Sequence, residues 1–266
     1  MALPLSELRM PAPQHVHAGD GVRLATYTWG DPDAPVVVMV HGFASDTQDN
    51  WVLTGWIRRL TGAGMRVLGI DLRGHGRSEK PHDPAAYSLR ILASDVETVL
   101  DTYLIDTARY LGYSLGGRVG WQVALDIPDR IERIVLGGVP DGTPLDRLDL
   151  DQVQDHLDHG AVVTDPVTQS YLDLTGRVPG NDLRALLALA RGMRGSTIAA
   201  DPRRAPSQPA LFATGSEDAV LDGSRRLADA APDARVFVIP GRHHFNAPAS
   251  RDFRIAAVDF LAGQTP

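Results

Sequence analysis

The stretch that decides the fold is RYLGYSLGGRVG, Arg109 to Gly120, which places one serine among four glycines. Its centre, GYSLG around Ser114, fits the pattern Gly-x-Ser-x-Gly. An apolar run predicts a short strand over Ala108–Tyr113, and helical periodicity predicts a helix over Leu115–Leu125. A sharp strand-to-helix turn leaves no room for side chains two residues either side of the serine, and glycine removes that collision. We therefore predict a turn that presents the Ser114 hydroxyl; the alternative is a glycine-rich turn that holds a serine by coincidence.

On both sides of this turn, predicted strands alternate with predicted helices. Further strands are expected at Val22–Trp29, Val36–Val40, Arg66–Ile70, Ile131–Val139, Ala210–Gly215 and Arg235–Pro240. Further helices are expected at Trp51–Leu60, Leu89–Leu104, Gly223–Ala231 and Phe253–Leu261. The run VVVMV is apolar on both sides, which is typical of a central strand covered on both faces. The alternation predicts an α/β fold with a mostly parallel central sheet flanked by helices on both faces.

One segment interrupts this alternation. Residues 141–205 contain short helical patterns, such as Leu183–Arg194, and dense aspartate, but no convincing strand. We predict one domain, in which residues 1–140 and 206–266 form the two parts of the core. Residues 141–205 are then a small helical cap inserted between them.

Composition narrows the class of protein. The 266 residues are 43% hydrophobic and carry a net charge of −7 without any long Lys/Arg run, which argues against nucleic-acid or anionic-membrane partners. There is no cysteine, so disulfides and thiolate metal sites are excluded. The start, MALPLSELRMPAPQ, lacks the basic and apolar parts of a secretory signal, and no apolar run is long enough to span a bilayer. We expect a cytoplasmic protein that acts on a small molecule.

Five segments in chain order carry a resemblance to a known family: VVVMVHGF, GIDLRGHGRS, GYSLGG, TGSEDAV and IPGRHHF. The chain resembles the α/β-hydrolase fold family, and its serine esterases in particular, from about residue 20 to residue 262. In that family the nucleophile comes first in the chain, the acid next and the histidine last. The resemblance implies that Ser114 is the nucleophile. It also implies an oxyanion hole formed by the backbone N–H groups of Leu115 and Phe43, with His41 bracing the HGF loop.

The segment RHHF offers two candidates for the general base, His243 and His244. In the family the base directly precedes a bulky apolar residue, four positions after the proline of IPG, which selects His244 and leaves His243 as a neighbour. A metal site made of both rings is disfavoured, because adjacent side chains of an extended segment point apart.

The histidine needs a carboxylate to orient it. The family pattern Gly-x-x-Asp selects Asp218 in GSED, with Glu217 as a solvated loop charge. A minority of the family takes its acid from the end of the preceding core strand, where this chain has Asp141, so Asp141 is the alternative acid.

Several other polar or aromatic residues need an interpretation. In DLRGHGRS we expect structural roles for His75 and Ser78 and an ion pair between Asp71 and Arg73. His156 and His159 have helical i, i+3 spacing, but no further ligand pattern accompanies them, so no metal and no cofactor is predicted. Two aromatic residues near the predicted site are candidate substrate contacts, with core packing as the alternative for the first: Trp51 and Tyr113.

These residues together predict a serine hydrolase that cleaves a carboxylic ester of a small molecule through an acyl-enzyme. Ser114 argues against the dehalogenases and epoxide hydrolases of this fold, which use aspartate at that position. Three alternatives stay open. GYSLGGR resembles the corresponding segment of menaquinone-pathway lyases, which suggests a C–C bond hydrolase or lyase, although the acidic cap argues against their acidic substrates. The others are a slow-turnover small-molecule receptor or signalling protein and a cofactor-free perhydrolase.

Overall fold

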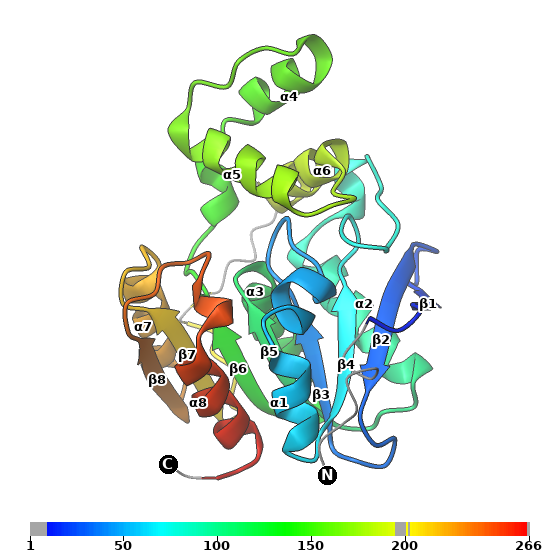
Figure 1. Cartoon of the computed structure of the whole chain (residues 1–266), viewed down its shortest axis with the longest axis vertical. Coiled ribbons are helices and arrows are strands. Elements are labelled where there is room, and N and C mark those ends of the chain that lie inside the picture. The colour runs from blue at the N-terminus through cyan, green and yellow to red at the C-terminus, as the bar shows by residue number, and fades with distance from the viewer. Residues whose placement is uncertain (1–9, 195–200, 202, 265–266) are drawn as a thin grey trace.

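A sheet of eight strands forms the centre of the molecule (Figure 1) within residues 10–194, 201 and 203–264, which the computed structural model describes. The strand order is β1-β2-β4-β3-β5-β6-β7-β8; β2 is antiparallel to both β1 and β4, and all other neighbours are parallel. The strands are β1 Gln14–His17, β2 Arg23–Trp29, β3 Val36–Val40, β4 Arg66–Asp71, β5 Ala108–Tyr113, β6 Ile131–Gly137, β7 Ala210–Gly215 and β8 Ala234–Ile239. The predicted α/β fold class is confirmed, and only β1 was not predicted.

Helices cover both faces of this sheet because its central strands are apolar on both sides. In β3, Val38 and Val40 face one core layer, whereas Val37 and Met39 face the other, and all four side chains are fully buried. The first layer is covered by α2 Leu89–Thr102, α3 Leu115–Asp126 and α7 Leu221–Ala230. The second is covered by α1 Trp56–Gly62 and α8 Arg251–Leu261. Short helical turns connect these elements at Gln48–Val52, Pro84–Ala86, Pro128–Arg130 and Ala247–Ala249.

The single helix predicted over Trp51–Leu60 is wrong. The chain instead forms a π-helical turn at Gln48–Val52 and then α1, with Gly55 between them at φ 83°. A residue in this left-handed conformation cannot continue an α-helix. The break brings the rings of Trp51 and Trp56 together edge to face, with centroids 5.5 Å apart, inside the second core layer.

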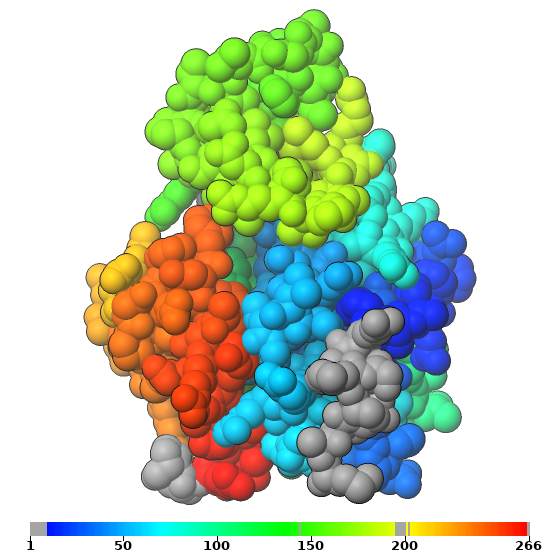
Figure 2. All heavy atoms as spheres, viewed as in Figure 1, coloured from blue at the N-terminus to red at the C-terminus, as the bar shows by residue number. Residues whose placement is uncertain are grey.

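Three helices of the cap lie above the edge at which the parallel strands end (Figures 1 and 2): α4 Leu150–His159, α5 Pro166–Arg177 and α6 Leu183–Arg194. A short 3₁₀ turn, Pro144–Arg147, leads from β6 into them. Asn181, between α5 and α6, donates a hydrogen bond to Ala44 O of the core (2.8 Å). At Gly192 of α6, an added Cβ would lie 2.3 Å from Pro84 O, so α6 packs directly on the core backbone. Both contacts hold the cap against the core.

Two sequence-based expectations fall partly outside the described residues. The expected lack of a leader concerns a segment whose residues 1–9 are not described, and the end of the predicted insertion includes residues 195–200 and 202. Among the helices that are described, none has both the length and the apolar character needed to cross a bilayer.

Packing of α3 on the sheet depends on Gly120. An added Cβ there would lie 2.2 Å from Cε1 of Tyr110, a fully buried ring whose hydroxyl donates to Gly116 O (2.7 Å). We expect Gly120→Ala to lower the free energy of unfolding by about 2 kcal/mol, because the overpacked ring must shift. Urea unfolding measures this. Gly62→Ala in α1 is the matched control, since an added Cβ there meets nothing within 4 Å, and it should stabilise the protein by up to about 1 kcal/mol. Equal effects of the two substitutions would contradict this account.

Candidate active site

Ser114 occupies the turn between β5 and α3, with φ 53° and ψ −111°. This strained conformation is possible because its neighbours have no side chains: an added Cβ would lie 2.2 Å from Gly116 O at Gly112, and 2.0 Å from Val40 O at Gly116. The Ser114 N–H donates to Gly137 O (2.8 Å), which holds the turn against β6. The turn thus directs the hydroxyl away from the sheet, toward the cap.

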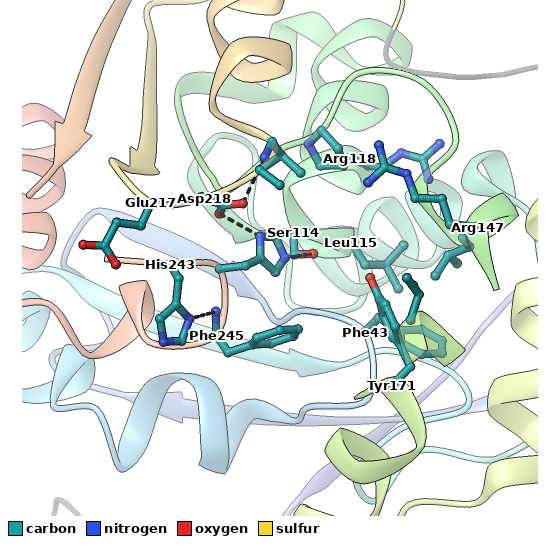
Figure 3. Close-up of a pocket in the computed structure, with 16 residues that line it drawn as sticks. Phe43, Ser114, Leu115, Arg118, Arg147, Tyr171, Glu217, Asp218, His243 and Phe245 are labelled. Carbon is teal, nitrogen blue, oxygen red and sulfur yellow. Dashed lines mark hydrogen bonds and ion pairs between the residues drawn. The ribbon is translucent and has the colours of Figure 1, made fainter. Parts of the chain in front are cut away.

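The structure brings together the three residues that the sequence places far apart (Figure 3). His244 Nε2 lies 2.9 Å from Ser114 Oγ, and His244 Nδ1 lies 2.8 Å from Asp218 Oδ2. The Asp218 side chain is only 1% exposed, and its Oδ1 accepts a hydrogen bond from Val220 N (3.0 Å). A buried carboxylate on one ring nitrogen keeps the other nitrogen free to take the serine proton.

Short contacts hold the two loops that carry Asp218 and His244. Ser216 N donates to Ile239 O and Glu217 N donates to Arg242 O, both at 2.9 Å. The Tyr113 hydroxyl donates to His244 O (2.6 Å) from a buried ring. Tyr113, predicted as a substrate contact, therefore positions the His244 loop, and it also lines part of a cavity beside Ser114.

The alternative base and acid lie elsewhere. The His243 ring accepts a hydrogen bond from Phe245 N (3.3 Å) and, within the described residues, does not contact Ser114. Asp141 Oδ2 accepts from Arg226 Nε (2.8 Å) instead of orienting a histidine. Geometry therefore favours His244 over His243 and Asp218 over Asp141.

The two predicted oxyanion donors flank Ser114. Leu115 is the first residue of α3, where a helix leaves its N–H without an intrahelical partner. Phe43 follows β3, and its N–H donates to no acceptor in the described part of the chain. Gly42 N donates to Asn50 Oδ1 (3.0 Å), and an added Cβ at Gly42 would lie 3.5 Å from Ser114 Cβ. This close approach places the loop directly beside the serine.

Two buried histidines brace this loop. His41 Nε2 accepts from Leu72 N, and His75 Nε2 accepts from Ala44 N, both at 3.1 Å. Burial lowers the pKa of His75 well below its usual value, so the ring is neutral and can act as an acceptor. Ser78 Oγ donates to Asp71 O (2.5 Å), in a structural role as predicted.

The predicted ion pair between Asp71 and Arg73 is wrong. Arg73 binds Asp95 (2.7 Å) and Asp20 (2.6 Å), whereas Asp71 accepts hydrogen bonds from Tyr27, Thr47 and Arg77. The two side chains are directed to different sides of the sheet, since Asp95 belongs to α2 and Tyr27 packs in the layer under α1.

The surface histidines of the cap make local contacts. His156 Nδ1 lies 2.8 Å from Ala161 O, and His159 pairs with Asp155 (2.7 Å). No group of three potential ligands suited to a metal ion occurs in the part of the chain that is described.

Two cavities meet at Ser114, of about 380 Å³ and about 150 Å³. Both are lined by Phe43, Ser114, Tyr171, His244 and Phe245. Trp51 lines neither, because the π-helical turn buries its ring completely against Trp56; its interpretation as a substrate contact is therefore corrected to core packing.

Sequence reasoning did not single out Arg118, Arg147 and Tyr171 as lining residues of the larger cavity. Arg118 could have been found, because it follows Ser114 by four residues on a predicted helix and so lies on the same side one turn later. Arg147 and Tyr171 come from the cap, and no signal in the sequence directs them to the site.

Comparisons with known proteins agree with this architecture. A family model described as "alpha/beta hydrolase fold" matches residues 35–162. Epoxide hydrolase B of Mycobacterium tuberculosis is 38% identical over 125 residues, which are 45% of this chain and 33% of that protein. A putative 2-succinyl-6-hydroxy-2,4-cyclohexadiene-1-carboxylate synthase of Bacillus subtilis is 29% identical over 128 residues, 48% of this chain and 45% of that protein. The chain thus matches less than half of the length of these curated relatives.

Solved structures match over nearly the whole chain. The enol-lactonase from Burkholderia xenovorans LB400 superposes with a TM-score of 0.76 and 24% identity, over 93% of this chain and 99% of that one. Together with the sheet order and the strand–turn–helix at Ser114, these matches show that the chain has the α/β-hydrolase fold.

Proposed function

We propose that the protein is a serine hydrolase that cleaves a carboxylic ester of a small molecule. The main support for this proposal is a continuous chain of hydrogen bonds. It runs from Ser114 Oγ to His244 Nε2 (2.9 Å) and from His244 Nδ1 to Asp218 Oδ2 (2.8 Å). As Ser114 attacks the ester carbonyl, His244 takes its proton and Asp218 stabilises the charged ring. The N–H groups of Phe43 and Leu115 hold the oxyanion.

The second half of the reaction uses the same groups. His244 returns its proton to the departing alcohol, leaving an acyl group on Ser114. His244 then takes a proton from water, which attacks the acyl carbonyl, and returns it to Ser114 Oγ as the bond to the acyl group breaks and the acid leaves. The two cavities that meet at Ser114 suit the two halves of an ester.

Ser114 also weighs against the epoxide chemistry of relatives such as epoxide hydrolase B. Opening of an epoxide by a serine hydroxyl would leave an ether on the protein. An ether has no carbonyl for water to attack, so the enzyme could not be regenerated by the route above. An ester, including the cyclic ester that the name enol-lactonase implies for a structural neighbour, avoids this difficulty.

The proposal is tested by incubating the protein with p-nitrophenyl esters of two to eight acyl carbons and, separately, with styrene oxide. We expect ester hydrolysis with a clear optimum of chain length, since both cavities are bounded, and no epoxide opening above the uncatalysed rate. Epoxide turnover without ester turnover would reject the proposal.

The role of the acid is tested by comparing Asp218→Asn with Asp141→Asn. Loss of the carboxylate beside His244 should lower kcat by roughly 10³- to 10⁴-fold, because the ring loses its orientation and its charge partner. Asp141→Asn only weakens a partly exposed pair with Arg226 and should leave kcat within about threefold of the original. A comparable loss in both variants would contradict the assignment of Asp218.

A further inference from the structure

Arg118 is a buried cation without a partner among the residues that the structure describes. It lies on α3 and is 3% exposed, yet its side chain makes no hydrogen bond or ion pair with any described residue, and its Nε is fully enclosed. The equally buried Arg73 shows the usual arrangement, with hydrogen bonds to Asp20, Asp95 and Ala86 O. Burying a charge without compensation is costly, so Arg118 calls for an anion that the described part of the chain does not supply.

This unpaired group lines the larger cavity beside the nucleophile. Its backbone N–H donates to Ser114 O (3.0 Å), so it follows the serine by one helical turn, a rise of about 5.4 Å. Pro140 and Leu145 also line this cavity, and apolar side chains in a cavity strengthen the charge interactions within it. Burial also lowers the pKa of Arg118 to about 10, so the guanidinium remains charged at neutral pH.

A second cation borders the same cavity. Arg147 reaches it from the 3₁₀ turn that leads into the cap, and it has no hydrogen-bond or ion-pair partner among the described residues. Figure 3 shows Arg118 and Arg147 toward one end of the cavity and Glu217 toward the other, with Ser114 between them. The cavity therefore has a positive end.

The aspartates of the cap do not neutralise that end. Among the described residues, Asp146 is the acid whose charge raises the pKa of Arg118, but it accepts a hydrogen bond from Thr143 and faces Arg194 (3.9 Å). Asp149 and Asp165 accept backbone N–H groups at the starts of α4 and α5. The acidic composition of the cap, which argued from sequence against an acidic substrate, is thus used mainly in helix caps and surface pairs.

We propose that the substrate carries a carboxylate in the half that occupies the larger cavity, and that Arg118 binds it, with Arg147 adding a second positive charge. This inference rests on the proposed function and names its substrate class. A guanidinium fork matches a carboxylate with two parallel hydrogen bonds, and both partners would be largely shielded from water. A neutral ester would leave the Arg118 charge unpaired in every turnover.

The first experiment compares esters that differ only in this charge. In the first series, mono-p-nitrophenyl succinate, glutarate and adipate carry the carboxylate in the acyl half, and their methyl esters lack the charge. In the second series, 4-acetoxybenzoate carries the carboxylate in the alcohol half, and its methyl ester lacks the charge. In one of these series we expect kcat/KM to be about 30-fold higher for the acid than for its methyl ester. Arg118→Gln should reduce this ratio to near 1, Arg118→Lys should restore part of it, and Arg147→Gln should lower it about fivefold. Arg184→Gln, an exposed cap arginine, should leave the ratio unchanged.

A binding measurement separates this inference from the proposed function. Calorimetry on Ser114→Ala should show binding of glutarate or benzoate, and not of their methyl esters, with the binding lost when Arg118→Gln is added. Such binding supports the anion site even if no ester is cleaved. The inference is overturned if esters are cleaved with ratios near 1 in both series, or if neither carboxylate binds.

Discussion

Replacing Ser114 with alanine should abolish ester hydrolysis, with kcat lowered by at least about 10⁴-fold. In the proposed mechanism Ser114 Oγ forms the bond to the acyl group, and without it the remaining groups can only polarise the ester and a water molecule. Initial rates with the best p-nitrophenyl ester, at protein concentrations high enough to detect 0.01% residual activity, provide the measurement.

The substitution should change activity and not the fold. Alanine keeps the strained backbone at φ 53° and loses one hydrogen bond to a half-buried ring, so the free energy of unfolding should change by about 1 kcal/mol or less. Ser114→Gly is the matched variant: it also removes the hydroxyl but relieves the strain, and it should be at least as stable as Ser114→Ala. Activity above 1% in both variants would exclude Ser114 as the nucleophile.

The second large effect distinguishes two adjacent histidines. His244→Ala should lower kcat by at least about 10³-fold, because only His244 reaches both Ser114 Oγ and Asp218. His243→Ala removes a ring of the same size from the next position and should change kcat by less than about fivefold. The same ester assay measures both variants.

Chemical rescue makes this comparison sharper. His244→Ala leaves a space next to Ser114 that opens to the larger cavity, so added imidazole should recover part of the lost rate. It should not accelerate Ser114→Ala. The assignment of the base would be wrong if His243→Ala caused the larger loss, or if the two histidine variants were equally impaired.

Residues of the cap line the cavities in which we propose that the substrate binds. Tyr171 of α5 packs on Phe43 of the HGF loop, with ring centroids 5.8 Å apart, and lines both cavities. Arg147 enters the larger cavity from the turn before α4. Residues of the inserted segment thus border the space in which an ester would lie, while the residues proposed for the chemistry all belong to the core.

The amino-acid sequence was sufficient to predict the α/β fold and to select Ser114, His244 and Asp218 as candidates, which the structure brings within hydrogen-bond distance of one another. Both results depend on local patterns: apolar runs define the strands, and each candidate catalytic residue follows the end of a strand. Because the carboxyl ends of parallel strands meet at one edge of a sheet, residues more than 100 positions apart could be expected to approach one another.

Only the tertiary structure decided how side chains are paired and which of them face the cavity. The left-handed Gly55 placed Trp51 in the core, and opposite sides of the sheet separated Asp71 from Arg73. Arg118 was left without a partner in the part of the chain that the structure describes. Pairing depends on which distant elements pack together, and a change of one residue in a turn redirects every side chain that follows. Local pattern therefore determined the framework of this protein, and long-range packing determined the charge and shape of its site.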